Sequence, residues 1–197
     1  SAVKRMLAMI NYPRTLPVFL CAMCSNHKKR IQMDVARWNE IDQIPFNFFE
    51  SINWHMTYKK EFRNLIQHRL KNPSRTLMAM CHYAIARVLW KPMESLYIYT
   101  EDIGGGLYIQ HGFATMIAAE KIGENCWINQ QVTIGYKDNT RSPIIGNNVM
   151  ITCGAKVLGN ITVGDNSVIG ANAVVVKDVE PGSTMVGIPA QPINTRE

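Results

Sequence analysis

The hydrophobic and polar positions divide the chain into two segments with different periods. From residue 1 to about 95, apolar residues recur at spacings of three and four, with Lys and Arg between them, as in amphipathic helices. The stretches "HMTYKKEFRNLIQHRLKN" and "PSRTLMAMCHYAIARVLW" each carry one apolar stripe, and the second begins with a Pro. The shorter stretches "MDVARWNE" and "PFNFFESINW" are compatible with further helices. The spacing therefore predicts a helical N-terminal domain over residues 1–95.

After Tyr97, an aliphatic residue recurs at every sixth position. The run comprises Ile122, Ile128, Ile134, Ile145, Ile151, Val157, Val163, Ile169 and Val175. Its one irregular step, from Ile134 to Ile145, is 11 residues long. A strict period of six does not fit an α-helix, whereas each hexad can supply a short strand with its aliphatic residue inward and a Gly or Asn at the corner. Three strands make a triangular coil of about 18 residues, and stacked coils bury a column of Ile and Val. The pattern predicts an α+β protein whose second half is a parallel β-helix of four to five coils.

Four segments of the second half carry a resemblance to a known family: "IGGGLYIQHG", "INQQVTIG", "PIIGNNVMITCGAKVLGNITVGDNSVIGANAVVVKDV" and "VGIPA". They resemble the hexapeptide-repeat acyltransferases, above all the serine O-acetyltransferases and the related capsule-type O-acetyltransferases. The resemblance implies a left-handed parallel β-helix over residues 96–197 with a short C-terminal tail. It also implies acetyl-CoA as co-substrate, no metal, and a homotrimer or a dimer of trimers with each active site between two subunits.

His111, in "LYIQHG", stands at the place of the family's catalytic histidine. An alcohol is a poor nucleophile at neutral pH, and imidazole can take its proton as the oxygen attacks a thioester. His111 occupies the third place of its hexad, which alternation turns away from the aliphatic column. The resemblance implies that His111 is the general base. The alternative is a surface or subunit-interface histidine that makes an ordinary hydrogen bond.

The 11-residue step carries the second functional prediction. Its extra residues must leave the stack as a loop, and insertions in repeat proteins often form binding surfaces. The resemblance implies that Arg141 in this loop pairs with the substrate carboxylate through its fork of N–H donors, and that Gln110 lies beside the substrate amine. A solvated loop arginine is the alternative for Arg141.

The cofactor site is also assigned by the resemblance. It implies that CoA lies along backbone amides and small side chains of Gly135, Cys153, Gly154 and Ala171, with Lys177 as a partner for its phosphates. The corners and packing of a β-helix require small residues as well, so a purely structural role is the alternative at these positions.

Three departures from the serine acetyltransferase pattern bear on the acceptor. Gln110 replaces an aspartate, Ser142 replaces a second histidine, and Leu96 stands where the family has an acidic residue 15 positions before the catalytic histidine. Glu94, 17 positions before His111, is the substitute that we assign for orienting the ring.

These departures leave two acceptors open. The favoured one is L-serine, which would make the chain a serine O-acetyltransferase of cysteine biosynthesis. The other is a hydroxyl of a sugar or capsular polysaccharide precursor, and a non-catalytic β-helix scaffold is the rival of a different class. The sequence ends in "PINTRE" without the long tail by which some serine acetyltransferases dock onto cysteine synthase, so that partner is not expected.

Composition adds a charge asymmetry. Residues 1–95 contain 15 Lys and Arg against 6 Asp and Glu, whereas the remainder contains 6 against 9, within a net charge of +6. The basic residues are interspersed with apolar ones and carry no nucleic-acid motif, so we expect a solvated helical face. Contact with nucleic acid or an anionic membrane face is the alternative.

Cysteine usage and apolar runs bound the compartment. The five cysteines are an odd number without a recognisable secretion signal, which favours free thiols in the reducing cytoplasm. No apolar run reaches the roughly 20 residues of a membrane span. Cys21, Cys24 and His27 resemble half of a zinc site with no second pair downstream, so no metal site is predicted.

Overall fold

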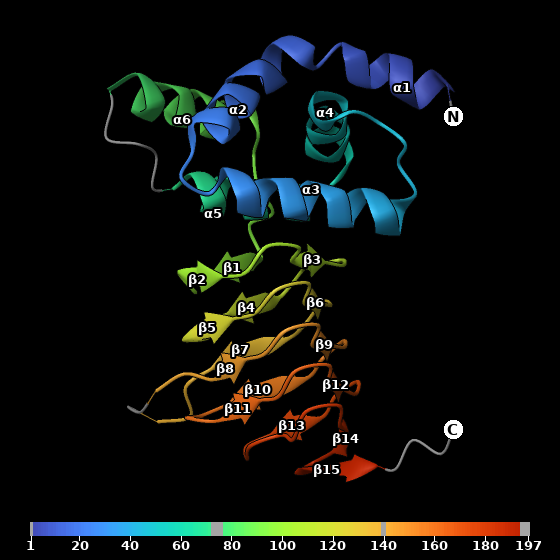
Figure 1. Ribbon diagram of the computed structural model, residues 1–197, viewed down its shortest axis with the longest axis vertical. Coiled ribbons are helices and arrows are strands. Elements are labelled where there is room, and N and C mark those ends of the chain that lie inside the picture. Colours follow the sequence, from blue (N-terminus) through green and yellow to red (C-terminus); the bar gives the residue numbers. More distant parts are fainter. Residues whose placement is uncertain (1, 72–76, 139–140, 194–197) are drawn as a thin grey trace. The chain divides into compact units, whose positions relative to one another are not determined.

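The computed structural model describes residues 2–71, 77–138 and 141–193 (Figure 1). It contains two compact units, Ser1–Met93 and Glu94–Glu197. The described part of the first unit is helical, and that of the second consists of short strands joined by corners.

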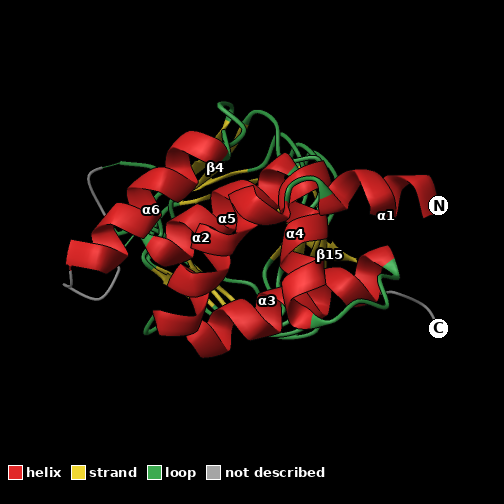
Figure 2. Ribbon diagram, turned by 90° about the horizontal axis from the view of Figure 1, so that it is seen from above, coloured by secondary structure: helices red, strands yellow, loops and turns green. Residues whose placement is uncertain are grey.

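The helical unit is built from α1 (Ala2–Met9), α2 (Tyr12–Cys24), α3 (Lys28–Asp42), α4 (Phe48–Tyr58), α5 (Lys60–Leu70) and α6 (Leu77–Leu89). Within this unit, α1, α2 and α6 lie along one edge, and α3 and α5 lie along the other (Figure 1). The view from above shows α6 beside α2 (Figure 2), and the two helices pack against each other. Pro13 lies in the first turn of α2, where its missing N–H costs no hydrogen bond.

The expectation of one continuous helix in "HMTYKKEFRNLIQHRLKN" is wrong, because the chain breaks between α4 and α5. Lys59 is extended, with φ −123° and ψ 104°. The Arg63 side chain reaches back to donate from Nε to the Met56 carbonyl at 2.6 Å and from Nη2 to the Thr57 carbonyl at 2.9 Å. A guanidinium that binds the carbonyls at a helix end takes the place of the hydrogen bonds that a continued helix would make.

The core of the helical unit combines aromatic packing with a buried ion pair. The rings of Trp38 and Phe62 meet edge to face at 5.1 Å, and the His55 ring lies 5.0 Å from that of Phe62. Arg69 donates through Nε to Asp34 at 2.9 Å and through Nη2 at 3.2 Å, and both side chains are buried. The two parallel hydrogen bonds pair the charges of Arg69 and Asp34. Either charge buried without a partner would destabilise the fold.

The second unit is a parallel β-helix with three faces, which confirms the prediction from the period of six. Sheet A contains β1 (Leu96–Ile98), β4 (Thr115–Ile117), β7 (Thr133–Gly135), β10 (Lys156–Leu158) and β13 (Val174–Val175). Sheet B contains β2 (Asp102–Ile103), β5 (Lys121–Ile122), β8 (Ile144–Ile145) and β11 (Thr162–Val163). Sheet C contains β3 (Tyr108–Ile109), β6 (Trp127–Ile128), β9 (Met150–Ile151), β12 (Val168–Ile169), β14 (Thr184–Gly187) and β15 (Ala190–Ile193). All pairings are parallel except that of β14 with β15.

The hexad aliphatics align in the register of these sheets. Ile103 pairs with Ile122 in sheet B, Ile109 with Ile128 in sheet C, and the corresponding residues of later coils continue each column. These side chains are buried. Burial of such a column at about 25 cal/mol per Å² of apolar surface stabilises the stack and fixes which residues point outward.

Two corners recur from coil to coil, and both bear on function. The CA corner, from a sheet C strand to the next sheet A strand, comprises residues 110–114, 129–132, 152–155 and 170–173. The AB corner, from sheet A to sheet B, comprises residues 99–101, 118–120, 136–143, 159–161 and 176–178. The regular step is six residues, but the CA corner of the first coil spans eight, from Ile109 to Ile117. The 11-residue step lies in the AB corner of the third coil, between Ile134 and Ile145.

Candidate active site

The CA corner is a continuous ladder of stacked turns. Gln131 N–H donates to the Phe113 carbonyl at 3.0 Å, Gly154 N–H to the Gln130 carbonyl at 3.0 Å, and Asn172 N–H to the Cys153 carbonyl at 2.9 Å. Each bond joins one coil to the next, so the four turns are held in register. A rigid backbone of this kind can position side chains for catalysis.

His111 projects from the longest turn of this ladder. Its side chain is exposed, as its place in the hexad predicts, and its backbone is left-handed, with φ 58°. Within the chain that the structure describes, the imidazole makes no hydrogen bond. Both ring nitrogens are therefore accessible to a substrate or to another subunit.

Backbone strain gathers at this corner. The left-handed residues of the described β-helix are otherwise Gly or Asn, and the exceptions are His111, Ala114 and Gln131, all on the CA corner. A left-handed residue with a Cβ costs roughly 1–2 kcal/mol, which the packed coils must offset. Strain of this kind is often found where a side chain must be aimed for function.

Two buried amide oxygens on the coil after His111 lack partners in the described structure. They are Oδ1 of Asn129 and Oε1 of Gln130, on the second coil of the CA corner. A buried acceptor without a donor costs about 1–3 kcal/mol, so both atoms favour a donor that this chain does not supply. Sequence reasoning missed them, although "INQQ" places adjacent amides directly after a hexad aliphatic.

A positive charge also lies beside the CA corner. The ammonium of Lys156 in β10 donates to the Gln131 carbonyl at 2.6 Å. The two residues are 25 positions apart in sequence, and the stacking of coils brings them together. Lys156 was not among the predicted site residues.

The predicted site residues fall on two corners that flank sheet A. Gln110, Cys153, Gly154 and Ala171 share the CA corner with His111. Gly135, Arg141 and Lys177 instead lie at or next to the AB corner, where Gly159 N–H donates to the Gly135 carbonyl at 2.9 Å. Arg141 and Lys177 are exposed. One copy of the chain therefore holds these residues at two separate edges of the β-helix.

Comparisons with known proteins decide the family. Residues 142–177 match the family described as bacterial transferase hexapeptide (six repeats). The chain is 36% identical over 166 residues to a serine acetyltransferase of Staphylococcus aureus (strain Mu50 / ATCC 700699), which covers 82% of this chain and 76% of the relative. The chain belongs to the serine acetyltransferase family.

Solved serine acetyltransferases have the same fold. The enzyme of Neisseria gonorrhoeae in complex with serine superposes with a TM-score of 0.62 and 30% identity, over 89% of this chain and 73% of that chain. A serine acetyltransferase in complex with CoA gives a TM-score of 0.58 and 28% identity, over 84% of this chain and 69% of that chain. The left-handed β-helix and the acyltransferase class expected from the sequence are confirmed.

Glu94 is the residue that we assigned to orient the histidine of this family member. Thr115 N–H donates to the carbonyl of Ser95 at 3.1 Å, which places the backbone next to Glu94 beside the CA corner. The Glu94 carboxylate is exposed, and no hydrogen bond or ion pair joins it to His111 in the described structure. Its role stays a prediction.

The small residues of the predicted CoA site have structural roles of their own. Gly154 is left-handed, with φ +74°, and a Cβ there would lie 2.0 Å from Asn172 Oδ1. Gly135, by contrast, has no atom within 4 Å of where a Cβ would be. Packing thus requires a glycine at residue 154, whereas at residue 135 packing leaves room for a side chain.

Cys126 lies in the core of the β-helix and not at the candidate site. It is buried, and its thiol donates to the Gly146 carbonyl at 3.1 Å. Burial raises the pKa of this thiol to about 11, so it stays protonated at neutral pH. No group of three or more His, Cys, Asp or Glu suited to a metal occurs among the described residues.

Proposed function

We propose that the chain transfers the acetyl group of acetyl-CoA to the hydroxyl of L-serine, giving O-acetyl-L-serine and CoA. The observation that carries this proposal is His111, exposed and strained on the CA corner, in a chain that is 36% identical to a serine acetyltransferase. The relatives in complex with serine and with CoA support both substrates. The reaction belongs to the synthesis of cysteine, and five free thiols support a cytoplasmic location.

His111 acts as general base and then as general acid. The unprotonated ring nitrogen takes the proton of the serine hydroxyl as its oxygen attacks the thioester carbonyl carbon. A C–O bond forms, the carbonyl electron pair moves onto oxygen, and backbone N–H groups stabilise the oxyanion. Collapse of this intermediate breaks the C–S bond, and the imidazolium returns its proton to the CoA sulfur.

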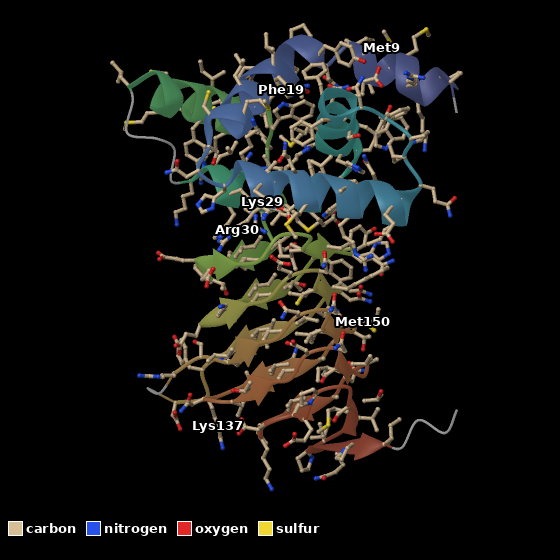
Figure 3. All side chains as sticks on the ribbon, in the orientation of Figure 1. Met9, Phe19, Lys29, Arg30, Lys137 and Met150 are labelled. Atoms are coloured by element: carbon tan, nitrogen blue, oxygen red, sulfur yellow. The ribbon has the colours of Figure 1, made fainter. Side chains whose placement is uncertain are left out.

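The active site forms between two subunits of a homotrimer. Arg141 lies on the AB corner, so the partner's Arg141 can face His111 when the two corners of neighbouring subunits meet. A contact through sheet C is supported by Trp127 and Met150, which pair in neighbouring strands and are half-buried; Met150 is labelled in Figure 3. Sheet B instead presents Asp102 and Lys121, which are exposed and 3.8 Å apart.

CoA lies along the CA and AB corners, with Lys177 near its phosphates. Cys153, Gly154 and Ala171 leave the backbone of the CA corner open to an extended ligand. Gly135 leaves the backbone of the AB corner open in the same way, because no atom lies within 4 Å of where a Cβ would be.

The acceptor hydroxyl has a second candidate. Gln110 and Ser142 stand where the family carries charged or titratable groups, which favours an acceptor without an amine, such as a sugar or a capsular polysaccharide precursor. The 36% identity to a serine acetyltransferase and the relative solved in complex with serine favour L-serine instead.

Release of the CoA thiol, measured with L-serine and with a panel of sugars, tests the proposal. Release with L-serine supports it, and His111→Ala should then lower kcat by roughly 10²- to 10⁴-fold while CoA still binds. A near-normal rate in that variant would contradict the role of His111. Release with a sugar alone would establish the second acceptor, and absence of both release and CoA binding would indicate a scaffold.

A further inference from the structure

Helix α1 leaves most of its apolar side chains exposed. Ala8 is buried, and the Arg5 guanidinium donates to the Glu50 carboxylate of α4 at 3.2 Å. The side chains of Val3, Met6 and Ile10 are 62%, 64% and 72% exposed. A helix of a water-exposed surface normally turns its apolar side chains inward, so the exposed side of α1 favours an apolar partner.

The same kind of surface continues on α2 and α6, which pack against each other. On α2, Leu16, Leu20 and Met23 follow the spacing of one helical face and are exposed. On α6, Leu77 and Val88 are 76% and 78% exposed. We call the exposed large apolar residues of the three helices, with Ile10 in the turn after α1, the apolar face; they are Val3, Met6, Leu7, Met9, Ile10, Leu16, Leu20, Met23, Leu77, Met80, Ile85 and Val88.

The three helices of the apolar face carry charged side chains of one sign. The sequences of α1, α2 and α6 contain no Asp or Glu, whereas they contain Lys4, Arg5, Arg14 and Arg87. Over residues 1–93, 15 Lys and Arg stand against 5 Asp and Glu. A second copy docked through the same helices would place like charges opposite each other without an acidic residue to pair with them. An anionic lipid surface matches both the apolar side chains and the positive charge.

We propose that the apolar face docks onto the surface of a bilayer that contains anionic lipids. No single helix of the described chain is long and apolar enough to cross a membrane. The pair α1 and α2 reaches the required length and hydropathy together, but the two helices are bent by 75° at Ile10 and Asn11. Two apolar helices at such an angle can lie in the interface with their side chains in the acyl region and Lys4 at the headgroups.

Binding of the full chain to vesicles tests this proposal. The probes are vesicles of phosphatidylcholine alone and of phosphatidylcholine mixed with phosphatidylglycerol. We expect sedimentation with the mixed vesicles, weakened by salt, and at least about tenfold weaker binding to neutral vesicles. The triple variant M6Q/I10Q/V88Q should bind the mixed vesicles at least about tenfold more weakly. The matched control is Ile188→Gln on the β-helix unit, where the side chain is 75% exposed and is not part of the apolar face, and it should bind as the unchanged chain does.

Two further measurements keep the outcomes separate. Circular dichroism and thiol release are used to check that the triple variant is folded. The variant Lys4→Glu leaves the apolar side chains in place, so it should lower binding to the anionic vesicles but not to the neutral ones. Equal binding by the triple variant and the unchanged chain, or no binding to mixed vesicles, would overturn the proposal. Sedimentation velocity that shows self-association lost in the triple variant would assign the apolar face to a second copy instead.

Discussion

A side chain at Gly154 should destabilise the CA corner for two separable reasons. The left-handed backbone, φ +74°, costs an alanine roughly 1–2 kcal/mol. The new Cβ would also lie 2.0 Å from Oδ1 of Asn172, which must rotate away and give up its place in the stack. We estimate a further ~1 kcal/mol for that displacement, in the range of a strained or lost side-chain contact. Gly154→Ala should therefore lower the free energy of unfolding by about 2–3 kcal/mol.

Gly182 provides the matched control for the backbone effect. Its φ is +73°, and no atom lies within 4 Å of where its Cβ would be. Gly182→Ala should therefore cost about 1–2 kcal/mol, which is the backbone part alone. Asn172→Gly removes the obstructing side chain without backbone strain, and in that background Gly154→Ala should cost no more than Gly182→Ala.

Urea unfolding followed by far-ultraviolet circular dichroism measures these differences. The reasoning is refuted if Gly154→Ala costs no more than Gly182→Ala in the unchanged background, because the clash with Asn172 then contributes nothing. It is also refuted if Asn172→Gly fails to reduce the cost of Gly154→Ala.

Two more predictions concern the helical unit and the loop. Burial lowers the pKa of His55 from 6.5 to about 4, against the attraction of the Asp42 carboxylate. The unfolded chain therefore takes up this proton at a higher pH than the folded chain, so stability is full above pH 6.5 and falls as the pH drops towards 4, by on the order of 3 kcal/mol. His55→Gln should flatten this dependence in urea titrations between pH 7.5 and 4.5, and an unchanged slope would exclude His55 as its source. Arg141→Lys should raise KM for L-serine about tenfold or more without changing KM for acetyl-CoA, since an ammonium cannot bind a carboxylate with two parallel N–H donors. Lys137→Ala, on the same loop (Figure 3), should leave KM for L-serine unchanged; equal effects of the two variants on this KM would remove Arg141 from the acceptor site.

The fold of the second half follows from its sequence because the repeat is a physical requirement. Each strand must place one aliphatic side chain in the column, so the period of six predicts the position of each strand. The sequence does not say which corner takes an extra residue. Between Ile109 and Ile122 the sequence has two hexads plus one residue, and the structure divides these positions into steps of eight and five around Ile117. The spacing of apolar residues gives the number of extra residues between two strands. The hydrogen bonds between coils decide at which corner these residues bulge out.

The helical half was less predictable because its decisive contacts are not periodic. The break at Lys59 depends on the reach of Arg63 to two carbonyls of α4. At the candidate active site, likewise, a local motif predicts the role of His111, but the approach of Lys156 to Gln131 depends on the stacking of residues 25 positions apart. That Arg141 and His111 lie on two different corners likewise becomes clear only when the strands are assigned to the three sheets.

The two lengthened steps of the β-helix carry the residues that we propose for catalysis and for binding the acceptor. In a regular hexad, each outward side chain is confined to the flat face of a strand or to a short corner, and its direction is fixed by the column inside. A side chain that must reach a substrate needs additional backbone. The eight-residue step carries His111, and the 11-residue step carries Arg141. The regular coils between and below them supply the rigid support, and the strained residues His111, Ala114 and Gln131 mark where that support holds a turn in a conformation that it would not adopt alone. In a repeat protein of this kind, interruptions of the period are therefore the first places to search for catalytic residues.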